Sequence, residues 1–298
     1  MGTEFTYDAV GNREGLLDVL TYISPTNTPL WSSLAKKAVS ATYTEWLTQA
    51  LPSATSNAAV EGAAWSAGTV TARVRTGNYS QILKKCYTIS RTQNNVDKAA
   101  VADEIAEQRK LALLNLARDI EYALINGTGN SGASGTAREM KGIRSFISTT
   151  NTTGTGTGSE DLTESMFNDC LQAIKAQNGD PTDVYVNAFQ KRQISQFKGR
   201  EGNVTVMDNA SAKAAYNVVD MYYGDFGSLS IHYHNLATTS EVLILQQDMF
   251  QVGIFDSPQI KEVLPGAIDG ASFGIVTELT LLSKNEAFSG KITQLSTS

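Results

Sequence analysis

One long amphipathic segment limits the folds open to this chain more than any other feature. From Asp97 to Asn126, apolar side chains recur at helical spacing and form one broad stripe. Asp97 is placed to cap the first turn, and Gly127 is placed to end the helix. Such a helix is about 45 Å long, whereas a compact chain of 298 residues is about 50 Å across. We therefore expect a flat, elongated subunit built along this helix.

A long hairpin is expected before the helix, from Ala41 to Ser90. Three stretches have the composition of strands: residues 41–47, 69–75 and 82–89. The intervening residues 52–68 are rich in alanine, serine and glycine, and Trp65 is almost their only large apolar side chain. Such a segment cannot form a core of its own, so we expect it to project and to order against another molecule. Trp46 and Trp65 flank this tip and are candidate interface anchors.

The rest of the chain divides into an arm before the hairpin and an α/β part after the long helix. The arm has a helical pattern at 13–23, a proline-containing break at 24–29 and a second short helical pattern at 30–37. A glycine-rich loop at 127–142 and a linker at 149–158 follow the long helix. Thr163 then caps a helix that ends near Gly179, with Leu162 packed on Phe167. A short helix is expected at 190–198, and strands at 184–186, 229–233, 242–245, 250–255, 273–282 and 290–295.

The motifs that resemble active sites favour structural interpretations. Residues 127–132 fit G-x-G-x-x-G, but a helix precedes them where a dinucleotide site needs a strand, so a flexible loop is favoured. His232 and His234 lie two apart on a strand and point to one face, yet no ligand-spaced motif supports a metal, and surface histidines are favoured. Cys86 and Cys170 lie in unrelated segments. The sequence therefore predicts no enzyme activity, cofactor or metal.

Charge and hydropathy exclude two further classes of function. The net charge is −6, and lysines and arginines occur in pairs rather than in the concentrated basic face of a tight nucleic-acid binder. No apolar run approaches the length of a membrane span, and residues 1–5 do not read as a signal peptide. We therefore expect a soluble protein made in a reducing cytoplasm, without a membrane partner.

The order of segments resembles the major capsid proteins of tailed bacteriophages with the Hong Kong 97 type fold, and local motifs resemble the family of phage SU10. These motifs cover most of the chain in order: residues 7–14, 23–29, 44–46, 60–62, 77–82, 137–142, 225–227, 285–287 and 290–292. The resemblance implies an α+β fold with an N-terminal arm, an extended β-hairpin loop, a long spine helix and an α/β axial domain. The corresponding divisions are an arm at 1–40, a hairpin loop at 41–91, a peripheral domain at 92–158 with the spine helix at 97–126, an axial domain at 159–265, and strands at 266–298 that return to the peripheral domain.

The function implied by this resemblance is that of a shell subunit. It would self-assemble into hexamers and pentamers of an icosahedral capsid that encloses double-stranded DNA without sequence-specific binding. It would be assembled in the host cytoplasm and reside in the virion, with scaffolding, portal and decoration proteins as possible partners. Candidate contacts between subunits lie on and beside the hairpin: Trp46, Glu61, Trp65, Arg73, Arg75, Lys84 and Lys85.

One feature distinguishes this chain from covalently welded shells of the same fold. Those shells join a lysine of the extended loop to an asparagine of a neighbour, but residues 38–83 contain no lysine here. The sequence therefore predicts a shell held together without covalent cross-links. Three alternatives remain open: an encapsulin-like compartment shell, another phage structural protein such as a tail protein, and an enzyme that uses the 127–132 loop.

Overall fold

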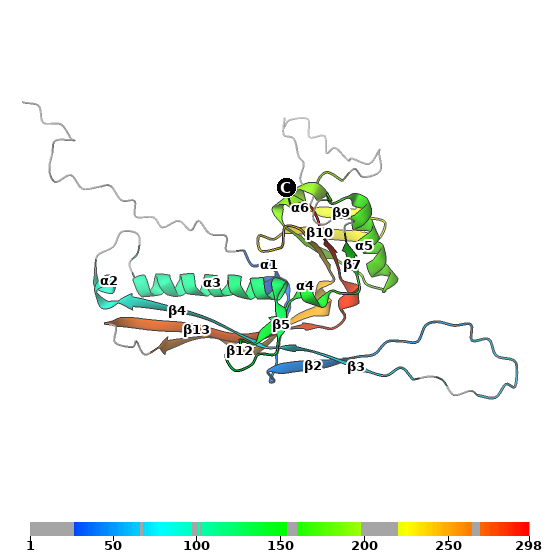
Figure 1. Cartoon of the computed structure of the whole chain (residues 1–298), viewed down its shortest axis with the longest axis horizontal. Coiled ribbons are helices and arrows are strands. Elements are labelled where there is room, and N and C mark those ends of the chain that lie inside the picture. Colours follow the sequence, from blue (N-terminus) through cyan, green and yellow to red (C-terminus); the bar gives the residue numbers. More distant parts are fainter. Residues whose placement is uncertain are drawn as a thin grey trace, which may run out of the picture.

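The long helix of the computed structural model is α3, Glu104–Asn126. The structure describes residues 27–65, 68, 70–96, 101, 103–153, 160–197, 220–263 and 269–297. The expected arm helix at 13–23, residues 24–26 of the proline-containing break, the cap at Asp97 and residues 154–158 of the linker lie outside these residues. Figure 1 shows α3 lying along one sheet, a hairpin projecting from the opposite end, and a second sheet with its helices standing above.

Helix α3 begins seven residues later than the spacing predicted. Its N-cap is Asp103, whose Oδ1 accepts hydrogen bonds from the backbone N–H groups of Ile105 and Ala106 at 2.9 and 3.3 Å. This carboxylate satisfies donors that would otherwise be free at the helix start, which fixes the first turn there. Gly127 follows the last turn as predicted. The predicted apolar stripe is buried at Ala112, Leu116, Ile120 and Leu124.

A four-stranded sheet lies beneath α3 in the order β1-β12-β13-β4. Its strands are β1 (Ala35–Ala38), β12 (Phe250–Val263), β13 (Gly270–Ser283) and β4 (Gln81–Ser90). Two predictions are wrong here. Strand β4, expected within the hairpin loop, pairs with β13 along its whole length, and the helix expected at 30–37 is α1 (Pro29–Ser33) followed by β1, which pairs with β12. In both cases pairing with a distant strand overrides a local pattern.

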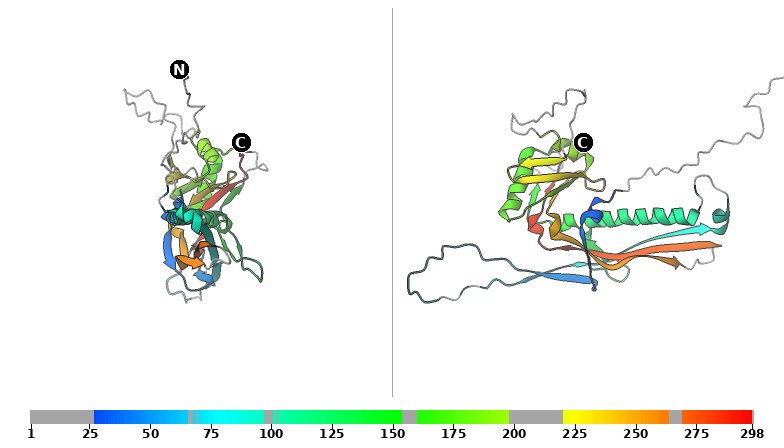
Figure 2. Two further views of the ribbon diagram at one scale, coloured as in Figure 1. Left: turned by 90° about the vertical axis from the view of Figure 1, so that its left-hand side faces the viewer. Right: turned by 180° about the vertical axis from the view of Figure 1, so that it is seen from behind.

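The projecting hairpin is shorter than expected. Strand β2 (Tyr43–Thr48) pairs antiparallel with β3 (Val74–Tyr79), so the second strand begins at Val74 rather than near residue 69. The described residues between the two strands form an extended loop that reaches away from both sheets, as the right-hand view of Figure 2 shows. The short helix α2 (Arg91–Asn95) follows β4.

The second sheet has six strands in the order β7-β14-β11-β8-β10-β9. These are β7 (Asn151–Thr153), β14 (Gly290–Thr293), β11 (Val242–Leu245), β8 (Asp183–Val186), β10 (Gly227–Tyr233) and β9 (Met221–Gly224). Helices α5 (Glu164–Ala176) and α6 (Ala188–Ile194) pack against this sheet. As predicted, Thr163 caps α5, because its side-chain oxygen accepts a hydrogen bond from Met166 N at 3.3 Å.

The C-terminal strands are divided between the two sheets, which differs from the predicted division of the chain. Strand β12 lies within the expected axial segment 159–265, but it pairs with β13 in the four-stranded sheet. Strand β14 lies within the segment expected to return to the peripheral domain, but it joins the six-stranded sheet beside β11. The antiparallel β12–β13 pairing explains the first difference, because it joins strands on both sides of residue 265.

The six-stranded sheet separates two apolar cores. On β8 and β11, alternate side chains point to opposite faces. Tyr185, Leu243 and Leu245 pack with α1, α3 and the four-stranded sheet. Val184, Val186, Val242 and Ile244 pack instead with Phe167, Leu171 and Ile174 of α5. One sheet therefore forms a wall of both cores.

Short elements complete the described chain: β5 (Thr128–Asn130), β6 (Glu139–Lys141), α4 (Ile143–Phe146), η1 (Gln247–Met249) and η2 (Glu286–Phe288). The glycine motif at 127–132 is part of the β5–β6 hairpin, so it is more ordered than the flexible loop that we expected. Within the described residues, no helix combines the length and apolar character that crossing a membrane requires.

Candidate functional site

The hairpin carries most of the residues singled out from the sequence, and it holds them away from the body. Glu61 and Trp65 lie on the exposed tip, and the Trp65 side chain is fully exposed. Arg73 and Arg75 lie near its stem. Arg75 forms an ion pair with Glu45, and Arg73 Nε donates to Gln49 Oε1 at 3.3 Å. The tip is therefore open to another molecule, whereas both arginines have partners in their own hairpin.

Lys84 and Lys85 point to opposite faces of the four-stranded sheet. Lys85 Nζ lies 2.7 Å from Asp119 Oδ2 on α3, so Lys85 joins the sheet to the helix within one subunit. Side chains of β4 alternate between its two faces, and Lys84 lies on the exposed face with Ile82 and Cys86. Of the two lysines, Lys84 is the one that presents its side chain to solvent.

Trp46 lies where the hairpin meets the body, and it contributes to both. Its ring packs against the main core, with its centroid 6.1 Å from that of Phe146. Its indole Nε1 is buried, and it has no hydrogen-bond partner among the described residues. A buried unpaired donor is costly, so this N–H lowers the stability that the packing of the ring provides.

Trp46 lines a groove of about 620 Å³ between the hairpin stem and the segment 283–287. Ser283, which is 4% exposed, lines the same groove, and its Oγ also lacks a hydrogen-bond partner in the described structure. The sequence did not single out Ser283, because a serine in a Ser/Thr-rich chain carries no signal of its own. Both unpartnered atoms are buried in the wall of the groove and are not exposed on its surface.

Glu286 fixes the wall of this groove. Its carboxylate accepts from the backbone N–H groups of Ser148 and Thr149 at 2.8 and 3.3 Å and from their hydroxyls at 3.2 and 2.5 Å. Burial by itself raises the pKa of Glu286, but these four hydrogen bonds outweigh it and hold the pKa below its ordinary value of 4.5. The ionised carboxylate therefore holds the loop after α4 against η2.

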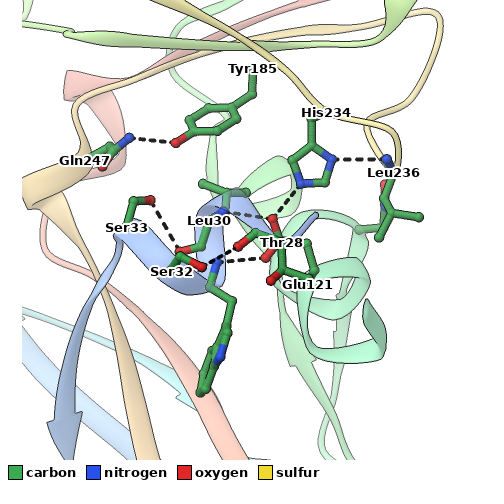
Figure 3. Close-up of polar contacts among 11 residues, drawn as sticks. Thr28, Leu30, Ser32, Ser33, Glu121, Tyr185, His234, Leu236 and Gln247 are labelled. Atoms are coloured by element: carbon green, nitrogen blue, oxygen red, sulfur yellow. Dashed lines mark hydrogen bonds and ion pairs between the residues drawn. The ribbon is translucent and has the colours of Figure 1, made fainter. Parts of the chain in front are cut away.

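A second polar cluster joins α3 and the six-stranded sheet to the start of α1, at Leu30 and Trp31, which we call the arm root (Figure 3). At its centre is Glu121, whose side chain is fully buried. Its carboxylate accepts from Leu30 N at 2.8 Å, from Trp31 N at 2.7 Å and from His234 Nε2 at 2.6 Å. Sequence reasoning missed Glu121, since a carboxylate on a long charged helix is ordinarily solvated.

The two histidines have separate partners rather than a shared one. His232 Nε2 lies 2.8 Å from Asp183 Oδ1, whereas His234 is buried against Glu121. Among the described residues, no group of three or more histidine, cysteine, aspartate or glutamate side chains is arranged to hold a metal ion. The expectation of surface histidines is thus wrong for His234.

Two more titratable groups near the cores are kept neutral by burial. Burial raises the pKa of Cys170 to about 11, while Cys86 is exposed on β4. Burial also raises the pKa of Tyr185 to about 12, and the Tyr185 hydroxyl accepts from Gln247 Nε2 at 2.6 Å. Neither group is set up as a nucleophile, because a nucleophile needs a lowered pKa or an adjacent base.

Comparison with known proteins gives a consistent result. The family model described as SU10 major capsid protein matches residues 2–296. A curated relative, the major capsid protein of Escherichia phage Phieco32, is 30% identical over 123 residues, which are 41% of this chain and 35% of that protein. The match to this relative thus spans about a third of its length.

Solved structures share the fold at low identity. The capsid asymmetric unit of cyanophage A-1(L) has a TM-score of 0.68 and 13% identity, with 98% of each chain covered. A chain from Microbacterium phage Oxtober96 has a TM-score of 0.67 and 13% identity, with 96% of each covered. The holo-SrpI encapsulin complex from Synechococcus elongatus PCC 7942 has a TM-score of 0.60 and 11% identity, covering 97% of this chain and 94% of that one.

Proposed function

Because the chain belongs to the SU10 major capsid protein family and has the Hong Kong 97 type fold, we propose that it forms hexamers and pentamers of an icosahedral shell around phage DNA. It is a major capsid protein, a structural component of the virion. Hexamers and pentamers require one chain to repeat the same contacts around closed rings. We propose three properties of the shell: its arrangement in hexamers and pentamers, the DNA that it encloses, and its stabilisation without covalent cross-links.

The observation that carries the proposal is the unsupported hairpin tip. Trp65 and Val60 are 103% and 82% exposed, and they lie on a loop that contributes nothing to either core. An exposed tryptophan on a long projection has a large apolar area to bury, and tryptophans are frequent anchors of interfaces. We take a neighbouring copy to be the molecule that covers it.

The groove at the hairpin stem supports the same proposal. Trp46, Ser283 and Glu286 are among the residues that line it, and a polar segment of a second copy would fill it. The same reasoning makes Trp46 an interface residue as well as a core residue. Scaffolding, portal and decoration proteins remain proposed partners, assembled with the chain in the host cytoplasm.

Electron microscopy of the purified chain, before and after substitution of Trp65, tests the proposal. We expect closed shells, or separated hexamers and pentamers, from the unchanged chain. Trp65→Ala should prevent or strongly weaken assembly while leaving the subunit folded, and Trp65→Phe, which keeps an aromatic anchor, should restore most of it. Unchanged assembly of Trp65→Ala would contradict the role given to the tip.

The content of particles made during infection separates the two kinds of shell that share this fold. Nuclease-protected double-stranded DNA is expected inside them. Protein cargo without DNA would favour the encapsulin-like alternative, for which the structural likeness to the SrpI complex is the supporting observation.

A further inference from the structure

Glu121 joins three parts of the subunit that are far apart in the sequence. It lies on α3, ninety residues from the arm root and over one hundred residues from the turn after β10. Oε1 accepts from Leu30 N and His234 Nε2, and Oε2 accepts from Trp31 N. A fully buried carboxylate is tolerated when several N–H donors surround it, and this one has three. Figure 3 shows Glu121 between Leu30 of α1 and His234.

The arm root depends on this carboxylate for its geometry. Helix α1 begins at Pro29, and the side chain of the preceding Thr28 makes no capping hydrogen bond. The free N–H groups of Leu30 and Trp31 are capped by Glu121 instead. Glu121 therefore sets the position of the first turn of α1 against α3.

His234 ties the same carboxylate to the six-stranded sheet in one defined protonation state. The backbone N–H of Leu236 donates to His234 Nδ1 at 3.1 Å, so Nδ1 carries no proton and Nε2–H must donate to Glu121. The turn is also held by Asn126 at the end of α3, whose Nδ2 donates to Leu236 O at 3.3 Å. The charged and titratable groups nearby, Tyr185, Asp183 and His232, belong to β8 and β10.

We infer that Glu121 is a positioning residue for assembly, which couples the placement of α1, within the N-terminal arm, to the placement of the turn after β10. This inference rests on the proposed function, since only an assembling subunit gives the arm a second copy to meet. The coupling itself is a property of one subunit.

Amide hydrogen exchange, resolved to single residues in the full-length chain, tests the coupling. Glu121→Gln replaces one carboxylate oxygen, which accepts hydrogen bonds, with an amide NH2 group, which can only donate. The N–H donors of Leu30, Trp31 and His234 then lose part of their acceptor. We expect exchange at Leu30 and Trp31 to rise roughly 10- to 100-fold, the range for loss of hydrogen bonds to a charged acceptor. Exchange at Leu236, which Glu121 does not touch, should rise at least roughly twofold. Glu104→Gln, the same change on the same helix, should leave all three amides unchanged.

The reciprocal variant starts from the other side of the cluster. His234→Phe keeps a ring but removes both nitrogens, so exchange at Leu236 should rise directly and exchange at Leu30 should rise through Glu121. His232→Phe, two residues away, is the matched control. If neither variant affects the amide on the far side of Glu121, the coupling is wrong, whether or not the variants lose stability at their own site.

Electron microscopy then links the coupling to assembly. Shells of the unchanged chain and of Glu104→Gln should have one diameter, and those of Glu121→Gln should be mixed in diameter or open. Uniform, wild-type shells from Glu121→Gln would overturn the assembly role. If the unchanged chain forms no shells, the proposed function fails, and the exchange experiment still decides the coupling separately.

Discussion

Lys85 on β4 and Asp119 on α3 form an ion pair across the contact between the four-stranded sheet and the long helix, with Nζ 2.7 Å from Oδ2. Their side chains are 39% and 42% exposed, so water screens the attraction. The pair aligns two elements that pack mainly through apolar side chains, and it leaves Lys85 without a free charge for a neighbour.

Replacement of the two adjacent lysines should therefore have different effects. Lys85→Met is expected to change the free energy of unfolding by about 1 kcal/mol or less and to leave assembly intact. Lys84→Met is expected to leave stability unchanged but to weaken assembly, because Lys84 faces solvent on the other side of β4. Urea unfolding and light scattering of assembling protein measure the two quantities. Equal effects of both variants on assembly would contradict this assignment.

Trp46→Phe should separate folding from assembly. It removes a buried N–H that has no partner in the described subunit, so the loss of ring area is partly offset. We expect the free energy of unfolding to fall by less than about 1.5 kcal/mol, while the critical concentration for assembly rises several-fold. Trp31→Phe, a change of the same kind at a residue that packs against the same core, is the control and should not alter assembly.

Glu286 should make stability depend on pH in the acid range. Its pKa is lower in the folded chain than the ordinary value of 4.5, so folding is favoured by the ionised form. This contribution is fully present above that ordinary value, and it is lost as the pH falls through the lowered pKa. Glu286→Gln should cost roughly 1 kcal/mol at neutral pH and flatten the acid side of the profile. Thermal unfolding from pH 3 to 7 measures both. An unchanged profile would show that the contacts with Ser148 and Thr149 contribute nothing.

The two thiols should differ sharply in reactivity. Cys86 is exposed, whereas burial raises the pKa of Cys170 to about 11 and denies reagents access to it. One thiol per native chain should therefore react with a disulfide reagent at pH 8, and two should react after unfolding. Cys86→Ser is expected to abolish the native reaction. Retention of that reaction would place the reactive thiol at Cys170.

Assembled particles should separate into single chains on denaturing gels. No lysine lies between residues 38 and 83, so the hairpin has no amine with which to form an isopeptide bond. We expect one band near 32 kDa from mature particles. A ladder of higher bands would show that a residue outside the hairpin forms cross-links.

Much of the order of elements could be predicted from periodicity and end signals. The stripe at Ala112, Leu116, Ile120 and Leu124 repeats strongly enough to identify α3, and Thr163 marks the start of α5 by capping. The start of α3 could not be predicted, because two aspartates precede the stripe and either could cap a helix. Asp103 accepts from the backbone N–H groups of Ile105 and Ala106 and is the N-cap. Helix ends depend on such single contacts.

The strand partners and the buried polar cluster could not be predicted from local pattern. Strand β4 alternates as a hairpin strand would, but its partner, β13, lies nearly two hundred residues away. Glu121 and His234 are polar residues whose burial follows from packing between sheets, and no spacing in the sequence joins them. Among the candidate contact residues, Glu61 and Trp65 are exposed on the hairpin tip, where a neighbouring molecule can reach them. Lys85 instead forms an ion pair with Asp119 of the same subunit.

The shared sheet limits how copies of this chain can differ in shape. Tyr185, Leu243 and Leu245 are buried on one face of it, and their neighbours in the strand are buried on the other. Rotation of one half of the subunit against the other would expose these side chains to water, at a cost of roughly 2 kcal/mol for each. In the proposed shell, copies in rings of five and of six should therefore differ mainly in the parts without a core, such as the hairpin tip, and these parts would accommodate the curvature of the particle.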